Sequence, residues 1–364
     1  MSRLERLRQA LDGAGLAALA LVPGPNLRYL TGLAMHPSER LTLAVLPLAE
    51  TPVLLLPALE VPRARERLAL DMELLPWSDE QGPDVALRRL RERLRLAGEC
   101  LGAEEQAMRL LEYHALQRAF PICHVVPADG LLATLRMHKD EEEIAAMRRA
   151  AAILEQGLQE TLQRLRPGMT EREAARTWQW AVAEAGGEAF GDAPIVVAGP
   201  RGASPHNVPS DRPIERGELV TLDWAAHVGG YYADITRTVA LGEIGPEQRR
   251  IYDLVLRANE AGRQAVRPGI PAQEVDRAAR RVIAGAGYGP YFLHRTGHGL
   301  GLEVHEPPYI VEGNDLPLAV GMTFTVEPGI YIEGLGGVRI EDDILVTPEG
   351  GESLTTMGRE LIVL

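Results

Sequence analysis

Four acidic residues lie in segments with the β-branched and aromatic composition that is typical of strands: Asp223, Asp234, Glu327 and Glu341. A single acid of this kind would be expected at the surface, because burying an unpaired carboxylate is costly. Carboxylate oxygens are also ligands that divalent metal ions accept. The four residues would form a metal site if the strands bring their side chains together.

The first two acids flank a turn signal, the sequence His-Val-Gly-Gly at 227–230. A hairpin centred between Val228 and Gly229 would place Asp223 directly opposite Asp234. Like charges that face each other across a sheet destabilise it. We therefore expect a positive group to lie between these two carboxylates.

The second two acids have the same arrangement. The midpoint of Glu327 and Glu341 is Gly334, within the turn sequence Glu-Gly-Leu-Gly-Gly at 333–337. A hairpin centred on Gly334 would oppose the two glutamates. Two acidic pairs, each opposed across a hairpin of apolar strands, are hard to explain as solvated surface.

Histidines supply a complementary set of ligands. His294, His298 and His305 fall within one glycine-rich segment. Gly297 argues against the helical zinc-protease motif, and the G-x-G-x-G spacing at 297–301 differs from the dinucleotide-binding fingerprint. A lone histidine is more often structural than a ligand, but three so close together favour a site.

Four carboxylates and one imidazole would suit two divalent ions roughly 3.5–4 Å apart. Such a carboxylate-rich site favours Mn²⁺, and the imidazole adds tolerance for Co²⁺, Zn²⁺ or Fe²⁺. Two such ions acidify a shared water and polarise a carbonyl group. The residues therefore predict hydrolytic chemistry.

The elements that must position these residues fall into two regions. The first third of the chain alternates helices and strands, which indicates a layered α/β sheet. We predict a helix over 3–13, strands over 17–22, 41–46 and 52–56, and a helix over 86–97 with Leu87, Leu90, Leu94 and Ala97 on its buried face and arginines on its solvated side. The stretch 140–165 reads as one long helix that connects the two regions.

The second region contains an internal repeat. Arg-Pro-Gly at 166–168 precedes a helical segment that ends at Ala185-Gly186, and Arg-Pro-Gly at 267–269 precedes one that ends at Ala286-Gly287. This repeat predicts a duplicated α+β half-domain. A two-fold arrangement of the halves would place a cleft on the pseudo-symmetry axis.

Composition excludes several other classes of protein. The 364 residues carry a formal net charge of −13, which argues against a nucleic-acid binder. The only lysine, Lys139, lies in an acidic helix start where we expect it to be solvated, so Schiff-base chemistry is set aside. There is no apolar run of membrane-spanning length, no signal-peptide core and no disulfide framework in Cys100 and Cys123, which predicts a cytoplasmic globular protein that does not bind membranes.

At these residues the sequence resembles the pita-bread metallopeptidases, specifically the Xaa-Pro branch that comprises prolidase and aminopeptidase P. The matching motifs are D-x10-D-I-T-R-T from Asp223, G-H-G-x-G-x-x-x-H-E-x-P from Gly297, T-V-E-P-G-I-Y from Thr325 and V-R-I-E-D from Val338. Weaker matches at 26–32, 135–143 and 205–206 extend the likeness over nearly the whole chain.

The resemblance implies a role for each ligand. Asp223 would chelate one metal, Asp234 and Glu341 would bridge both, and His298 and Glu327 would complete the second. Glu327 would also accept a proton from the attacking water as the general base.

The resemblance also implies roles around the metals. His305 and His206 would bind the scissile carbonyl and the tetrahedral intermediate, and His294 would line the proline pocket. Arg339 and Tyr231 would contact the substrate or support the ligands.

The fold implied is α+β, with a C-terminal pita-bread catalytic domain and an N-terminal α/β creatinase-like domain. The expected divisions are 1–130 for the N-terminal domain, 131–165 for the connecting helix region that starts the catalytic domain, and 166–364 for the metallopeptidase domain. The resemblance also implies a cytoplasmic homodimer that acts on short proline-containing peptides. Each subunit would bind two divalent ions, with Mn²⁺ as the preferred metal.

Related proteins differ in what they lack. Creatinase-type enzymes lose the metal ligands, as do metal-free peptide-binding modules, and methionine aminopeptidases usually lack a large N-terminal domain.

Between the remaining activities we favour the Xaa-Pro dipeptidase over the aminopeptidase that acts on longer peptides. A dipeptidase must bind the free carboxylate of proline, and we hypothesise that Arg40, in a loop of the N-terminal domain, caps a neighbouring subunit's site.

Overall fold

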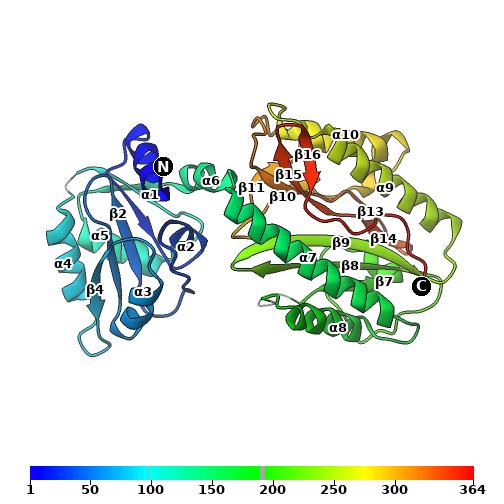
Figure 1. Ribbon diagram of the computed structural model, residues 1–364, viewed down its shortest axis with the longest axis horizontal. Helices are drawn as coiled ribbons and strands as arrows, with labels where there is room; N and C mark the ends of the chain where they lie inside the picture. Colours follow the sequence, from blue (N-terminus) through cyan, green and yellow to red (C-terminus); the bar gives the residue numbers. More distant parts are fainter. Residues whose placement is uncertain (97, 189–192) are drawn as a thin grey trace. The chain divides into compact units, whose positions relative to one another are not determined.

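The computed structural model describes residues 1–96, 98–188 and 193–364. These residues form two compact units, Met1–Arg136 and Met137–Leu364 (Figure 1). Within the described residues, every helix is too short or too polar to span a bilayer.

The N-terminal unit is built on a mixed six-stranded sheet with the strand order β4-β3-β2-β1-β5-β6. Its strands are β1 (Ala18–Leu21), β2 (Leu43–Pro47), β3 (Val53–Pro57), β4 (Glu73–Trp77), β5 (Cys100–Ala103) and β6 (His124–Pro127). Its helices are α1 (Arg3–Gly13), α2 (Pro25–Thr31), α3 (Val61–Arg67), α4 (Asp84–Leu94), α5 (Leu110–Ala119) and α6 (Asp129–Met137), with a 3-10 turn at Ala58–Glu60. The predicted α/β layering is therefore present.

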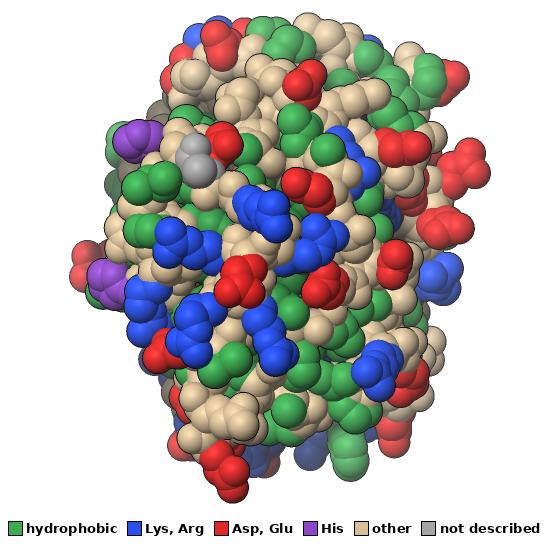
Figure 2. Space-filling view, turned by 90° about the vertical axis from the view of Figure 1, so that its left-hand side faces the viewer, with side chains coloured by type: hydrophobic (Ala, Val, Ile, Leu, Met, Phe, Trp, Pro, Cys, Tyr) green, Lys and Arg blue, Asp and Glu red, His purple; other side chains and the backbone are tan. Residues whose placement is uncertain are grey.

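Helix α4 is shorter than predicted. It ends at Leu94 because Arg95 adopts a left-handed conformation with φ 48°. Leu87, Leu90 and Leu94 are buried as expected, and Ala97 lies outside the described residues. The arginines of α4 are exposed, and Figure 2, which views the side on which α4 lies, shows basic and acidic side chains mixed on this surface.

The C-terminal unit consists of two α+β halves. The first contains α7 (Glu141–Arg164), α8 (Glu171–Glu184) and a three-stranded sheet of β7 (Ile195–Ala198), β8 (Glu218–Val228) and β9 (Tyr231–Leu241), with a 3-10 turn at Gly199–Ala203. Helices α7 and α8 bury one face of this sheet, where the rings of Trp178 and Trp224 pack edge to face with centroids 5.6 Å apart. The predicted long helix over 140–165 is thus α7, which packs on β8 and β9 (Figure 1).

The second half contains α9 (Pro246–Ala265) and α10 (Ala272–Gly285), followed by a 3-10 turn at Gly289–Tyr291. Its five-stranded sheet has the order β11-β10-β12-β15-β16, and β13 pairs with β14 as a separate hairpin. These strands are β10 (Gly297–Gly299), β11 (Glu306–Ile310), β12 (Thr323–Val326), β13 (Gly329–Ile332), β14 (Gly336–Arg339), β15 (Asp342–Thr347) and β16 (Gly350–Ser353).

The internal repeat is visible in matching backbone geometry. Helices α8 and α10 each have 14 residues. The glycines that precede them, Gly168 and Gly269, both have φ +87°, and their N–H groups donate to the carbonyls of Ile214 and Leu318 at 2.9 and 2.7 Å. Each half thus begins its second helix from the same turn, and each turn is fastened to a strand-like segment by the same hydrogen bond.

The first hairpin has a different register from the predicted one. The pairs Asp223↔Thr236 and Ala225↔Asp234 show that the two aspartates are not directly opposed. The turn is the two-residue loop Gly229-Gly230, with φ of 57° and 81°, so it is centred one residue later than predicted. The change displaces each partner by two positions, and because side chains alternate with a period of two, both aspartates still point to the same face.

The second hairpin has the predicted register. β13 and β14 pair from Gly329↔Arg339 to Ile332↔Gly336, and β12 and β15 continue the same register with Val326↔Asp342. Glu327 and Glu341 fall between the two ladders, so neither belongs to a named strand. The hairpin centred on Gly334 is confirmed, and the glutamates face each other where regular pairing is interrupted.

The expectation that Lys139 is solvated is wrong. Its side chain is only 2% exposed, and its Nζ lies 2.7 Å from Oε1 of Glu306. Asp140, Glu141 and Glu142 follow it and are exposed, whereas Glu143 is buried and the lysine itself precedes α7 and points inward.

Because the two turns have the same geometry, we expect the same substitution to cost the same free energy of unfolding in each. A Cβ at Gly168 or Gly269 would meet no atom within 4 Å, so substitution by alanine costs only the strain of the left-handed backbone. We expect Gly168→Ala and Gly269→Ala each to lower the free energy of unfolding by roughly 1–2 kcal/mol, measured by urea denaturation. Gly285→Ala, at the end of α10 without a positive φ or a close neighbour, is the control and should not destabilise the protein. Unequal costs for the two turns would contradict their equivalence.

Candidate active site

A cavity of about 720 Å³ lies in the C-terminal unit. Every site residue predicted from the sequence lines it except Tyr231 and Arg40. These lining residues are His206, Asp223, Asp234, His294, His298, His305, Glu327, Arg339 and Glu341. The walls also include Trp224, Tyr232 and Arg295.

The four acids converge because both halves of the unit deliver a pair. Asp223 and Asp234 share one face of the β8–β9 hairpin. The gap between the two ladders frees the backbone of the glutamates for contacts elsewhere: the N–H of Glu327 donates to the carbonyl of Thr296 at 2.8 Å, and that of Glu341 to Thr236 at 3.1 Å. The second bond joins the glutamate pair directly to β9, which carries Asp234.

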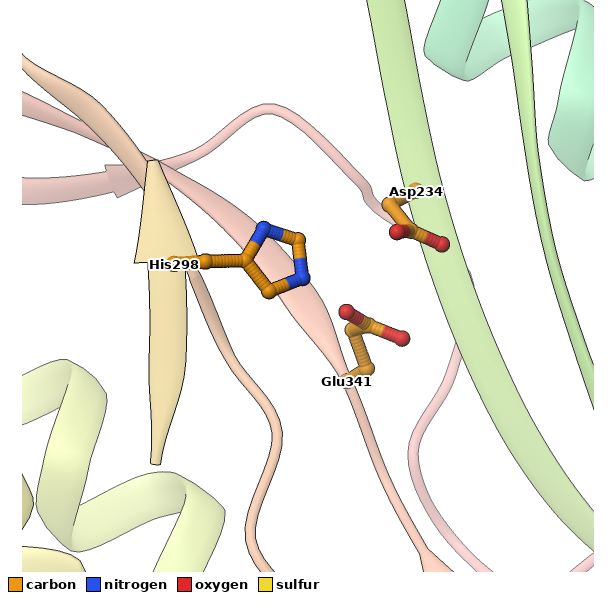
Figure 3. A group of neighbouring side chains, drawn as sticks. All are labelled: Asp234, His298 and Glu341. Atoms are coloured by element: carbon orange, nitrogen blue, oxygen red, sulfur yellow. The ribbon is translucent and has the colours of Figure 1, made fainter. Parts of the chain in front are cut away.

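Asp234, His298 and Glu341 form a cluster whose potential ligand atoms all lie within 4.8 Å of one another. Figure 3 shows the three side chains converging from separate segments. All three are buried, with exposed fractions of 6% or less. No hydrogen-bond partner among the described residues reaches Oδ1 of Asp234, so one buried carboxylate oxygen is left with nothing to bind.

Burial without compensating charge shifts the pKa values of these groups. Desolvation raises the pKa of Asp234 and Glu341 well above the usual range, and the neighbouring carboxylates raise them further. Desolvation also raises the pKa of Glu327 to about 7, although Arg339 opposes the shift. Ionisation of each acid makes ionisation of the others less favourable. A bound cation would offset this free-energy cost.

His298 is held as a neutral ligand. Burial lowers its pKa to about 3. Its Nδ1 lies 3.1 Å from the carbonyl oxygen of Gly299, which can only accept, so Nδ1 carries the proton and Nε2 presents a lone pair. Nε2 lies 3.2 Å from Oε1 of Glu327, so a proton or a metal ion must lie between these two atoms. The donor set therefore fits a divalent metal.

Arg339 places a positive charge next to Asp223. Its guanidinium is buried and donates to the carboxylate of Asp223, to the hydroxyl of Tyr331 at 2.7 Å and to Oγ1 of Thr236 at 3.2 Å. Thr236 in turn donates to Oε2 of Glu341 at 2.5 Å. One arginine thus positions a carboxylate from each half of the unit.

His294 continues this network. Its Nδ1 lies 2.7 Å from the carbonyl of Arg295 and therefore donates, so its Nε2, 2.8 Å from the Tyr331 hydroxyl, accepts. Burial lowers the pKa of His294 to about 4, which keeps the ring neutral. His305 lies with its ring centroid 4.3 Å from that of His298, and burial lowers its pKa as well.

Two predicted residues lie elsewhere. The hydroxyl of Tyr231 donates to Oε1 of Glu143 in α7 at 2.6 Å, and the next residue, Tyr232, lines the cavity instead. Tyr232 shares the face of Asp234, two residues later, so strand alternation would have identified it. Arg40 belongs to the N-terminal unit, where it pairs with Asp79 through two hydrogen bonds of 3.0 Å.

Three supporting residues received no role from the sequence: Thr236, Tyr331 and Asp343. The carboxylate of Asp343 accepts the backbone N–H of Asp234 at 2.9 Å, and its own pKa is raised well above the usual range by burial. The run Glu341-Asp342-Asp343 within an apolar strand was the available signal for Asp343. Thr236 and Tyr331 lie inside the recognised motifs, but their hydrogen bonds depend on the approach of other strands.

Known proteins match the chain over its full length. Residues 145–348 match the model of metallopeptidase family M24, and residues 3–138 match the creatinase/prolidase N-terminal domain. The probable dipeptidase PepE of Mycobacterium tuberculosis is 40% identical over 100% of this chain and 96% of its own length.

Solved structures agree with these matches. A prolidase from Thermococcus sibiricus superposes with a TM-score of 0.92 at 36% identity, covering 100% of this chain and 98% of that one. An X-Pro aminopeptidase from Thermotoga maritima superposes with a TM-score of 0.88 at 32% identity, covering 100% of both chains. The fold is thus a creatinase-type N-terminal domain followed by an α+β pita-bread domain, and the protein is a metal-dependent peptidase. The chain belongs to metallopeptidase family M24.

Proposed function

We propose that this protein is an Xaa-Pro dipeptidase (prolidase) that uses two divalent metal ions, Mn²⁺ first, to hydrolyse the bond before proline. The observation that carries the proposal is the buried cluster of Asp234, His298 and Glu341, with an oxygen of Asp234 that has no partner among the described residues. The names of the prolidase and dipeptidase relatives support the substrate class.

The metal ligands in this proposal are Asp223, Asp234, His298, Glu327 and Glu341. When bound, the ions would polarise the scissile carbonyl and make water acidic enough to supply hydroxide at neutral pH. The neutral imidazole of His298 already presents a lone pair, and Oδ1 of Asp234 has no other partner among the described residues.

The remaining steps fall to side chains of the cavity. Glu327 accepts the proton of the attacking water at a carboxylate oxygen. His305 and His206, both on the cavity wall, bind the scissile carbonyl and stabilise the charge that develops on its oxygen. His294, fixed by Tyr331, lines the proline pocket, and Arg339 maintains the position of Asp223.

A second candidate is Xaa-Pro aminopeptidase activity on longer peptides, favoured by the likeness to the Thermotoga maritima enzyme. We further propose that the protein is a cytoplasmic homodimer, in which Arg40 of one subunit caps the other subunit's site and binds the substrate carboxylate. Arg40 would then have to exchange its pairing with Asp79 for the substrate.

Metal removal should abolish activity reversibly. We expect a chelator to eliminate hydrolysis of an Xaa-Pro dipeptide and added Mn²⁺ to restore it. Asp234→Asn should lose at least about 100-fold in kcat/KM at the same Mn²⁺ concentration, because the amide cannot provide a charged ligand. Asp253→Asn, on the exposed side of α9, is the control and should recover fully. Full activity of the chelated protein would contradict the proposal.

Glu327 should make the metal-free protein respond to pH in a specific direction. Its folded-state pKa of about 7 exceeds the ordinary value of about 4.3, so acidification favours the folded protein. With chelator, wild type should gain roughly 2 kcal/mol of unfolding free energy relative to Glu327→Gln between about pH 8 and 5. Comparing the two proteins cancels the contributions of ionisable groups that do not interact with Glu327. A difference that does not vary with pH would show that Glu327 has an ordinary pKa.

Substrate length separates the two activities. A dipeptidase should cleave Leu-Pro at least about tenfold more efficiently than Leu-Pro-Ala, because only the dipeptide presents its carboxylate next to the cleaved bond. If Arg40 reads that carboxylate, Arg40→Ala should remove most of the preference, whereas Arg118→Ala, an exposed arginine of the same unit, should not. Preference for the tripeptide in wild type would favour the aminopeptidase, and an unchanged preference in Arg40→Ala would exclude Arg40.

A further inference from the structure

His305 lacks side-chain anchors of its own. Among the described residues its imidazole makes ring contact with His298 and no hydrogen bond, and its side chain is exposed to the cavity. The proposed function requires this ring to meet the substrate carbonyl. Its position must therefore come from the backbone of residues 299–306.

A buried ion pair holds that backbone in place. Glu306 follows His305 directly, and its carboxylate accepts a hydrogen bond from Nζ of Lys139 at 2.7 Å and from the N–H of Glu303 at 3.3 Å. The side chains of Lys139 and Glu306 are 2% and 4% exposed. The pair thus closes the turn that carries His305 through residues that do not line the cavity.

The glycine-rich segment fits closely around this pair. A Cβ at Gly301 would lie 2.8 Å from Oε1 of Glu306 and 2.9 Å from Cε of Lys139. The carbonyl of Gly301 accepts the N–H of Tyr232, which lines the cavity, at 2.8 Å. Gly301 therefore lies between the ion pair and the cavity wall, with no space for a side chain.

Lys139 is itself fixed on the other side. Its backbone N–H donates to the carbonyl of Gly321 at 2.9 Å, and the N–H of Gly321 donates to Val346 in β15 at 3.0 Å. The ammonium group therefore projects from a backbone that is attached to the five-stranded sheet. Neither Lys139 nor Glu306 lines the cavity, so the pair does not touch the substrate.

We propose that Lys139, the only lysine of the chain, is a positioning residue. Its ion pair with Glu306 holds the turn at 303–306 so that His305 faces the scissile carbonyl. This inference rests on the proposed function for the part that concerns catalysis. The structural part, that the pair orders residues 299–306, stands apart from the reaction.

The test removes both charges while conserving side-chain length. Removing one partner alone would leave a buried unpaired charge and could prevent folding. We expect the metal-loaded double variant Lys139→Met/Glu306→Gln to lose about 10- to 100-fold in kcat for Leu-Pro with KM within about threefold of wild type, because small displacements of a reacting group have effects of this size. The matched control is Arg212→Met/Glu218→Gln, which removes another ion pair of the same unit away from the cavity and should retain kcat.

Hydrogen exchange provides a readout that does not depend on activity. Amides of residues 299–306 should exchange faster in the Lys139/Glu306 variant than in wild type, and should be unchanged in the control. Unchanged exchange would overturn the proposal, as would a wild-type kcat or a loss of kcat equal to that of the control. If wild type failed to cleave Xaa-Pro bonds, the proposed function would fail, and exchange would still decide whether the pair orders this segment.

Discussion

Mutual repulsion among buried carboxylates is the constraint on which the catalytic unit depends. Asp234, Glu341 and Glu327 share one cavity, and burial shifts all three pKa values upward. Arg339 compensates only part of this charge, and it is committed to Asp223. A fold that brings these acids together is therefore incomplete without cations, and membership of a metallopeptidase family is the expected consequence.

The duplicated architecture explains how such a site can be assembled. Each half contributes one acidic pair from a hairpin or from the break between two ladders, so each half bears only part of the electrostatic cost. The hydrogen bonds from Arg339 and Thr236 then connect the pairs across the two halves. Rigid strands thus hold repelling groups in place before any ion arrives, which is the preorganisation that metal sites require.

The sequence predicted the residues of the site better than the residues that hold them in place. Strand-like composition and turn signals identified the four acids. The misplaced turn at Gly229 did not separate Asp223 from Asp234, because an even displacement preserves the face. The second hairpin was predicted correctly, since Gly334 lies at the centre of a turn signal. Lys139 was misjudged because its partner, Glu306, is distant in sequence, and local composition carries no information about a contact formed only on folding. Tyr331 and Thr236 escaped notice for the same reason.

The orientation of each hydrogen bond around His294 has a chemical consequence. The guanidinium of Arg339 donates to Tyr331, Tyr331 donates to His294, and His294 donates to the carbonyl of Arg295. Both ring nitrogens are therefore occupied, and a ligand that approaches His294 meets carbon edges and a π face. Proline in an Xaa-Pro bond has no amide hydrogen to offer. With both nitrogens already hydrogen-bonded, the imidazole of His294 can recognise a ligand only by its shape. It imposes no desolvation penalty on a residue that cannot donate a hydrogen bond.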